Sequence, residues 1–235
     1  MAAKSKLQIK CLYKDKIRQG RLNEHPIVVS GLGGIAIPVR LPLDVRSGPR
    51  LLEPILKDLD GVVYIRGEAS KHLREPEFDT LGNTVISLMQ KSANLRRLLI
   101  WTSIPKNSGK IYPSGEHRAF LKGVKSTEGL DWTIIRSGSW IDSLVGRNDE
   151  KGEERLRTAM KATPPGGIAL GAKYGDSIWK EDMCKVLLEV LKTDGLTGRT
   201  LDVKSVKPTK DNTVEKVIAE LAASPKEKSK PEKNV

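Results

Sequence analysis

Short apolar runs alternate with amphipathic segments along most of this 235-residue chain, and this alternation limits its folds more than any other feature. Four runs have the length and composition of buried strands: GVVYI at 61–65, RRLLIWTS at 96–103, DWTIIRSG at 131–138 and RTLDVKS at 199–205. Strands separated by segments of helical length predict parallel β-α-β units. Because these strands are largely apolar, we expect helices on both faces of the sheet. The sequence therefore predicts a three-layer α/β fold with a parallel sheet.

Apolar residues at helical spacing mark the segments between and after these strands. Such segments cover 80–93, 116–130, 180–195 and 211–223. The stripe of the third is Met183, Val186, Leu187, Val190 and Leu191, with Gly195 at its end. For the last helix, Asp211 or Asn212 is the expected N-cap. We predict one folded domain over 1–223 and a disordered tail, rich in Lys, Glu and Pro, over 224–235.

The formal net charge of +12 is concentrated at the two ends of the chain. Residues 1–22 hold seven Lys or Arg and one Asp, and residues 224–235 hold four Lys and two Glu. Basic tails bind polyanions through counterion release, so a nucleic-acid partner is weakly suggested. A solvated tail is the favoured interpretation.

Cysteine content and hydropathy limit the cellular compartments that we expect for this protein. The two cysteines, Cys11 and Cys184, are far apart, and the sequence has no C-x-x-C motif, so no metal site is expected. No apolar run approaches the roughly 20 residues of a membrane span. We expect a cytoplasmic protein without a membrane partner; the basic N-terminus leaves an organelle open.

Ligands of open parallel sheets bind at the carboxyl ends of the strands. In this sequence those ends are Asp44 and Val45, Arg66 and Gly67, Thr102 and Ser103, and Arg136, Ser137 and Gly138. We expect a ligand site where they meet.

Four segments, in the right order, carry a family resemblance. GLDWTIIRSGSWID at 129–142 resembles the "sGldwTivRPg" segment of atypical short-chain dehydrogenase/reductases, in particular the NmrA-like group close to biliverdin reductase B. The segments 41–67, 94–103 and 178–203 resemble other parts of the same family, and the resemblance runs from about Leu41 to Glu220. It implies a Rossmann-like domain that binds NADP or NAD.

The resemblance also implies roles for residues at the strand ends. Asp44 and Val45 match the pair along the adenine ring, and Gly67 matches a residue beside the ribose. Ser103 matches the serine near the nicotinamide. The cofactor-binding set is completed at one strand end by Arg136, Ser137 and Gly138. Ser137 departs from the family, which has Pro-Gly where this chain has Ser137 and Gly138.

A glycine-rich stretch, SGLGGIA at 30–36, has the spacing of a phosphate-binding loop at Gly31, Gly34 and Ala36. Such a loop needs a following helix, whose N-terminal N–H groups bind phosphate. Pro38 and Pro42 forbid a helix of useful length, so we expect extended chain there.

A second alignment explains more of the N-terminal region. Residues 6–22 resemble the family's second strand and the basic loop after it, which would make the sheet trimmed at its N-terminal β-α-β unit. The glycine stretch would then be inserted or diverged. Lys14, Lys16 and Arg18 either meet the 2′-phosphate of NADP or form a plain basic surface.

The proton-donating pair of the wider superfamily, Tyr-x-x-x-Lys, is incomplete, because Glu116 follows Tyr112 at the lysine position. The candidate catalytic residues are Ser103 and Tyr112, which would orient an acceptor. His117 is either a residue at a helix end or surface, or a proton donor. Trp140 is either a core residue or a platform that stacks on a flat substrate.

Two functions stay open. The leading one is an NAD(P)-binding oxidoreductase-like protein that passes hydride from NADPH to a small planar acceptor such as a flavin or quinone. The alternative is a non-catalytic Rossmann scaffold, an assembly or regulatory subunit that binds a protein or nucleic acid. The missing Tyr-Lys pair favours the scaffold, and the retained strand-end residues favour the enzyme.

Overall fold

The computed structural model describes residues 8–14, 27–29, 34–41, 53, 56, 59, 61–65, 75–92, 95–104, 115–141, 150–173 and 175–225. The chain forms two compact units, Met1–Leu56 and Lys57–Val235, which are described separately. A single domain over 1–223 stays a prediction. None of the described helices is long and apolar enough to cross a membrane.

The first unit contains a three-stranded sheet in the order β1-β3-β2. Its strands are β1 (Gln8–Lys14), β2 (Ile27–Val29) and β3 (Gly34–Leu41). β1 runs parallel to β3, whereas β2 runs antiparallel to it. Gly34 therefore begins a strand and not a helix, which confirms extended chain around Pro38; Pro42 lies outside the described residues.

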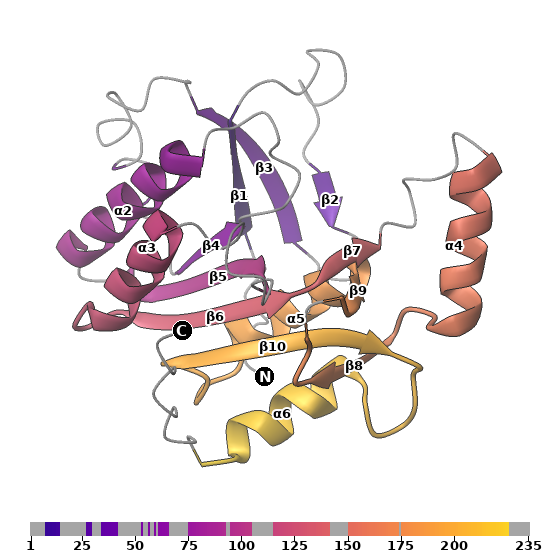
Figure 1. Cartoon of the computed structure of the whole chain (residues 1–235). Helices are drawn as coiled ribbons and strands as arrows, with labels where there is room; N and C mark the ends of the chain where they lie inside the picture. Colours follow the sequence, from indigo (N-terminus) through magenta and orange to yellow (C-terminus); the bar gives the residue numbers. More distant parts are fainter. Residues whose placement is uncertain are drawn as a thin grey trace. The chain divides into compact units, whose positions relative to one another are not determined.

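The second unit is built on a five-stranded sheet in the order β4-β5-β6-β10-β8 (Figure 1). These strands are β4 (Gly61–Ile65), β5 (Arg97–Ser103), β6 (Asp131–Ser137), β10 (Arg199–Val206) and β8 (Gly167–Leu170). The first four are mutually parallel, as predicted, and β8 is antiparallel to β10. A smaller parallel pair joins β7 (Ser139–Ile141) to β9 (Ser177–Trp179).

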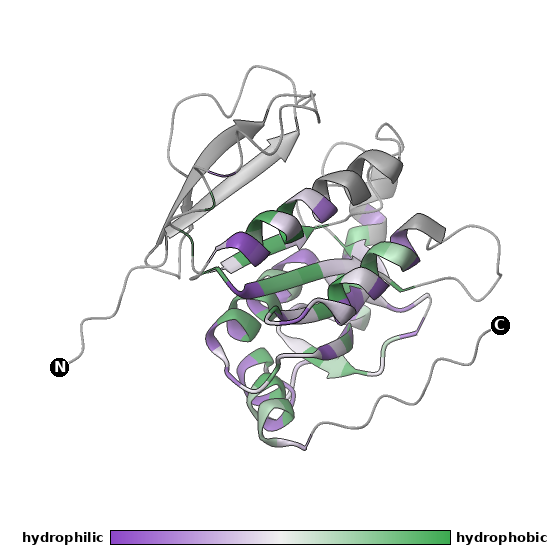
Figure 2. Ribbon diagram, turned by 90° about the vertical axis from the view of Figure 1, so that its left-hand side faces the viewer, coloured by the Kyte–Doolittle hydropathy of each residue, from purple (hydrophilic) through white to green (hydrophobic). Residues whose placement is uncertain are grey.

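Helices lie on both faces of the larger sheet, so the three-layer α/β prediction is confirmed (Figures 1 and 2). On one face lie α2 (Glu75–Lys91) and α3 (Gly115–Ser126), and on the other lie α5 (Lys180–Lys192) and α6 (Val214–Ala223). Among the described residues, a further helix, α4 (Glu150–Ala162), follows β7 and precedes β8. Figure 2 shows apolar residues concentrated in the sheet and on the helix faces turned toward it.

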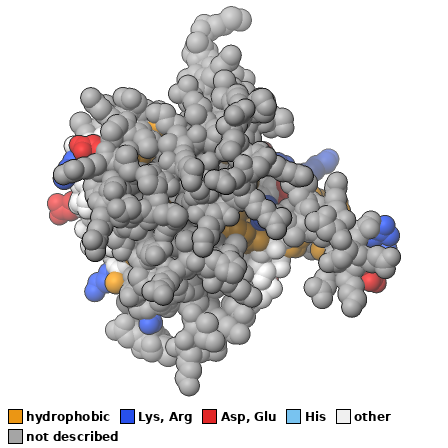
Figure 3. Space-filling view, turned by 90° about the horizontal axis from the view of Figure 1, so that it is seen from above, with side chains coloured by type: hydrophobic (Ala, Val, Ile, Leu, Met, Phe, Trp, Pro, Cys, Tyr) orange, Lys and Arg blue, Asp and Glu red, His pale blue; other side chains and the backbone are white. Residues whose placement is uncertain are grey.

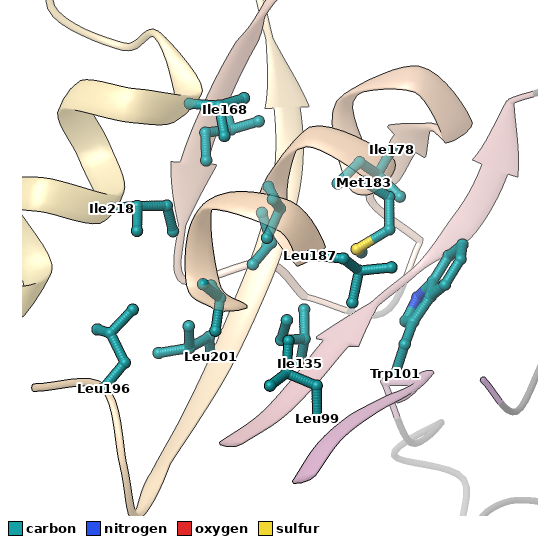
Figure 4. Packing of buried hydrophobic residues seen from close by; sticks show 14 residues of the cluster. Leu99, Trp101, Ile135, Ile168, Ile178, Met183, Leu187, Leu196, Leu201 and Ile218 are labelled. Atoms are coloured by element: carbon teal, nitrogen blue, oxygen red, sulfur yellow. The ribbon is translucent and has the colours of Figure 1, made fainter. Parts of the chain in front are cut away.

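The main core lies between the sheet and α5 (Figure 4). Met183, Val186, Leu187 and Val190 of α5 are buried there, which confirms four members of the predicted stripe. They pack with apolar side chains of the strands, among them Leu99, Ile135, Leu201 and Val203. Since each fully buried aliphatic side chain contributes about 1.5–3 kcal/mol, this cluster fixes α5 against the sheet.

The N-cap expected for the last helix is wrong by one or two positions. Thr213 caps α6, and its side chain accepts a hydrogen bond from the Lys216 N–H. Asn212 instead accepts from the Thr209 N–H and donates to the Lys207 carbonyl. Asp211 forms an ion pair with Lys216. Asp211, Asn212 and Thr213 are all residue types that can cap a helix. Asn212 is bonded within the preceding turn, and Thr213 is the residue that caps α6.

Candidate functional site

The carboxyl ends of β5 and β6 bring two predicted site residues together. Ser103 and Ser137 are paired in register on these adjacent parallel strands. The strands stay joined beyond this pair, because the Ile104 N–H donates to the Ser137 carbonyl at 2.7 Å. The expected meeting of these two strand ends is therefore observed in the backbone.

Ser137 is held by the core as well as by its strand. The Trp101 indole N–H donates to the Ser137 hydroxyl at 3.0 Å. Ser137 is fully buried and Trp101 is 4% exposed. The hydroxyl thus has a structural partner, which explains why a polar residue is tolerated at this buried position.

Gly138 occupies a position where no side chain fits. A Cβ there would lie 1.8 Å from the Asp176 carbonyl oxygen, far inside van der Waals contact. The next residue uses the same carbonyl, since the Ser139 N–H donates to it at 3.0 Å. This close approach of two backbones accounts for the glycine without reference to a ligand, so its cofactor role stays a prediction.

Arg136 makes a two-point contact with Asp202 on the neighbouring strand. Its Nε and Nη2 donate to the two carboxylate oxygens at 2.6 and 2.8 Å. The side chains are 24% and 28% exposed, so solvent reaches the pair. A negatively charged group of a cofactor at Arg136 would have to share the guanidinium with Asp202, so the cofactor-binding role of Arg136 stays a prediction.

Trp140 lies just beyond this strand end, in β7. Its ring packs on Trp101 with 4.3 Å between centroids and 31° between planes. The Lys180 ammonium lies over the Trp140 ring, 5.7 Å from its centroid. Trp140 is half-buried against the core cluster, which confirms a packing role.

The indole N–H of Trp140 is the unusual feature of this cluster. Its Nε1 is buried, and it has no hydrogen-bond partner within the described parts of the chain. A buried donor without an acceptor costs about 1–3 kcal/mol, so such groups are rare in folded proteins. An acceptor atom of a bound ligand would remove that cost, so this donor fits a ligand site at the carboxyl end of β6.

His117 lies at a helix end, as expected, but it is buried, so the expectation of a surface residue is wrong. It lies in the first turn of α3, is 1% exposed, and its Nε2 is 3.1 Å from the Thr102 hydroxyl. The imidazole also stacks on Phe120, with ring centroids 5.9 Å apart. The pairing with Thr102 brings His117 to the end of β5, where a role as proton donor stays a prediction.

A buried carboxylate next to the site was not singled out from the sequence. Asp182, in the first turn of α5, accepts hydrogen bonds from the Ser205 hydroxyl at 2.6 Å and the Gly166 N–H at 2.7 Å. Desolvation by burial raises the pKa of Asp182, and these two hydrogen bonds oppose the rise. The signal was an acidic residue directly before the apolar residues of α5.

The network around Asp182 also anchors the segment that leads out of α4. The Trp179 indole N–H donates to the Thr163 carbonyl at 2.6 Å, and the Trp179 backbone N–H donates to the Ser205 hydroxyl at 3.0 Å. Since α5 begins directly after Trp179, its first turn is tied to β10 and to the segment after α4.

The remaining predicted site residues lie outside the described residues. They are Gly31, Asp44, Val45, Gly67 and Tyr112, together with Lys16 and Arg18 of the basic segment.

On the face in Figure 3, the coloured hydrophobic side chains gather toward the middle, and charged side chains lie toward the edges.

Comparisons with known proteins support the fold. The oxidoreductase ylbE from Lactococcus lactis matches with a TM-score of 0.54 and 18% identity, over 78% of this chain and 77% of that chain. A Bacillus halodurans protein assigned as an NAD-dependent epimerase/dehydratase matches with a TM-score of 0.53 and 16% identity, over 79% and 88%. No protein-family model and no curated protein matches the sequence.

A weaker structural match concerns a cofactor complex. Yeast methylglyoxal/isovaleraldehyde reductase complexed with NADPH matches with a TM-score of 0.45 and 13% identity, over 72% of this chain and 59% of that chain. A likeness at this level says nothing about function. Together, the stronger matches show a Rossmann-like α/β fold similar to that of an oxidoreductase and of a protein assigned as an NAD-dependent epimerase/dehydratase.

Proposed function

We propose that the protein binds NADPH or NADH and passes hydride to a small planar acceptor of the flavin or quinone type. The observation that carries the proposal is the orphaned Trp140 N–H, which lies beyond the carboxyl end of β6 in a Rossmann-like sheet. This edge of a parallel sheet is where such folds bind their ligands.

We propose separate roles for the bound cofactor and for the residues of the site. A bound nicotinamide would supply the hydride, and the protein would supply position. The Ser137–Gly138 backbone would meet the cofactor, and the Trp140 N–H would donate to an acceptor atom. Ser103 and Tyr112 would orient the flat acceptor. Holding the acceptor against the donor ring removes much of the entropic cost of reaction, so no Tyr-Lys pair is needed for this step.

A titration with NADPH and NADH, followed by tryptophan emission, tests the proposal. We expect micromolar binding and a preference for NADPH. Trp140→Phe keeps a ring but removes the N–H, so affinity for the nucleotide or acceptor should fall about tenfold, the loss of one hydrogen bond. Trp132→Phe is the matched control, because Trp132 lies at the amino end of β6. NADPH oxidation with flavin and quinone acceptors then tests turnover.

The alternative is a Rossmann scaffold without catalysis. It is favoured by Arg136 and Ser137, whose side chains already have protein partners. Absence of nucleotide binding up to millimolar concentration would support this alternative and would contradict the oxidoreductase proposal.

A further inference from the structure

Two Ser/Thr-Pro dipeptides occur in the sequence, Thr163-Pro164 and Ser224-Pro225, and the structure distinguishes them. Serine or threonine followed by proline is the sequence that proline-directed protein kinases recognise. We propose that Ser224, at the end of α6, is a phosphorylation site for a kinase of this class. The proposal is independent of nucleotide binding.

Ser224 has the accessibility and backbone that the reaction needs. It is exposed and directly follows the last helical residue, with φ −77° and ψ 139°. This extended conformation is the one that a residue before proline prefers, and it also suits a substrate bound in a kinase cleft. The sequence that follows, Pro225 then Lys-Glu-Lys, is polar and basic.

Thr163 differs in accessibility and in its hydrogen bonding. It is half-buried, and its carbonyl accepts the Trp179 indole N–H at 2.6 Å. Pro164 and Pro165 lead directly into Gly166, whose N–H is bound by Asp182. Entry of this segment into a kinase cleft would break the part-buried hydrogen bonds to Trp179 and Asp182, so we expect the folded chain to protect Thr163.

A cation already lies at the proposed site. Arg199, the first residue of β10, donates from Nη1 to the Leu221 carbonyl at 2.9 Å and from Nη2 to the Ser224 carbonyl at 2.5 Å. The guanidinium thereby satisfies carbonyls at the C-terminus of α6, where the last turn has no basic residue of its own. It is also within reach of a phosphate on the same serine, and Arg pairs strongly with phosphate.

The chemistry is an ordinary phosphoryl transfer. The Ser224 oxygen forms a bond to the γ-phosphorus of a nucleoside triphosphate, the bond to the β-phosphate oxygen breaks, and the nucleoside diphosphate leaves. The hydroxyl proton passes to the base of the kinase. The esterified oxygen can then no longer donate to the Glu220 carbonyl, as the hydroxyl does at 2.9 Å.

The expected consequence is a looser last turn of α6. A doubly negative group at a helix C-terminus is repelled by the helix dipole. It also draws Arg199 away from the Leu221 and Ser224 carbonyls. Because Leu221 and Ala222 pack against the core cluster, the effect reaches the core. We expect a fall in Tm of about 2–4 °C for a chain of this size.

The test is incubation of the purified full chain with a proline-directed Ser/Thr kinase and ATP, followed by intact-mass and fragment mass spectrometry. We expect one phosphate per chain, located at Ser224, with none in Ser224→Ala and an unchanged yield in Thr163→Ala. A synthetic peptide spanning 218–232 checks that the kinase accepts the sequence. Phosphate at Thr163, or none at Ser224 whether or not the peptide is modified, would overturn the proposal.

Two further measurements test the role of Arg199 and the loosening of α6. Arg199→Gln frees the end of α6, so its initial rate of phosphorylation should rise several-fold, and an unchanged rate would contradict this role. The phosphorylated wild-type chain should melt at a lower temperature than the unmodified chain. An unchanged or higher Tm would overturn the proposed loosening of α6.

Discussion

The Trp101 indole N–H and the Ser137 hydroxyl, 36 residues apart in the sequence, form a buried hydrogen bond of 3.0 Å between adjacent strands. This bond joins β5 to β6 directly beside the pair of Ser103 and Ser137. The strand ends that form the candidate site are therefore held by a core interaction. Changes at Ser137 should affect stability before they affect ligand binding.

Ser137→Ala should lower the free energy of unfolding by about 1–3 kcal/mol, because the Trp101 N–H then stays buried without an acceptor. Urea unfolding followed by tryptophan emission measures the change. Ser139→Ala is the control, since Ser139 is exposed in β7, and it should stay within about 0.5 kcal/mol of wild type. Equal effects of the two variants would contradict the structural role of Ser137.

Gly138→Ala should be among the most damaging single changes in the second unit. The added methyl would meet the Asp176 carbonyl oxygen at 1.8 Å, and backbone on both sides would have to move. We expect a loss of about 1–3 kcal/mol or more, together with disruption of the β7–β9 pair.

The matched variant Gly123→Ala changes a helical glycine whose Cβ would meet nothing within 4 Å. It should stabilise α3 by about 0.5–1 kcal/mol, because alanine is the better helix former. Thermal unfolding of the two variants gives shifts of opposite sign. Shifts in Tm of the same sign would contradict the opposite effects predicted for Gly138→Ala and Gly123→Ala.

Asp182 should make stability fall as pH rises above the acidic range. Burial raises the pKa of Asp182 in the folded state, so the native chain keeps this proton at pH values where the unfolded chain has lost it. The stabilising contribution is complete below the unfolded pKa of about 3.9 and is lost as pH rises through the folded pKa. Asp182→Asn carries no such proton and should lack this component.

Urea unfolding of wild type and Asp182→Asn, from acidic to neutral pH, measures the difference. The gap in unfolding free energy between the two proteins should change with pH in the stated direction. If the difference in unfolding free energy between the two proteins stays constant across this pH range, the pKa of Asp182 does not differ between the folded and unfolded states.

Thr213→Ala should lower the free energy of unfolding by about 1 kcal/mol, the usual cost of a lost N-cap. Its hydroxyl oxygen accepts from the Lys216 N–H, whereas the ion pair of Asp211 with Lys216 is exposed. Asp211→Ala is therefore the control and should cost less than Thr213→Ala. If Asp211→Ala lowered the free energy of unfolding more than Thr213→Ala, Asp211 and not Thr213 would be the N-cap of α6.

The sequence by itself determined the four parallel strands and the layers of the second unit. The apolar runs correctly predicted β4, β5, β6 and β10, and helical spacing correctly predicted the buried stripe of α5. Pro38 correctly predicted extended chain in β3. These features follow from local periodicity and from the backbone limits of proline, which neighbouring residues carry in full.

Only the tertiary structure decided which polar groups meet. Ser137 lies against Trp101, and His117 lies against Thr102, because strand register and helix docking bring distant residues together. Asp182 is buried by contacts from β10 and from the segment after α4. The antiparallel placement of β8 has the same origin. Burial and hydrogen-bond partners depend on residues far apart in the chain, and no local pattern records them.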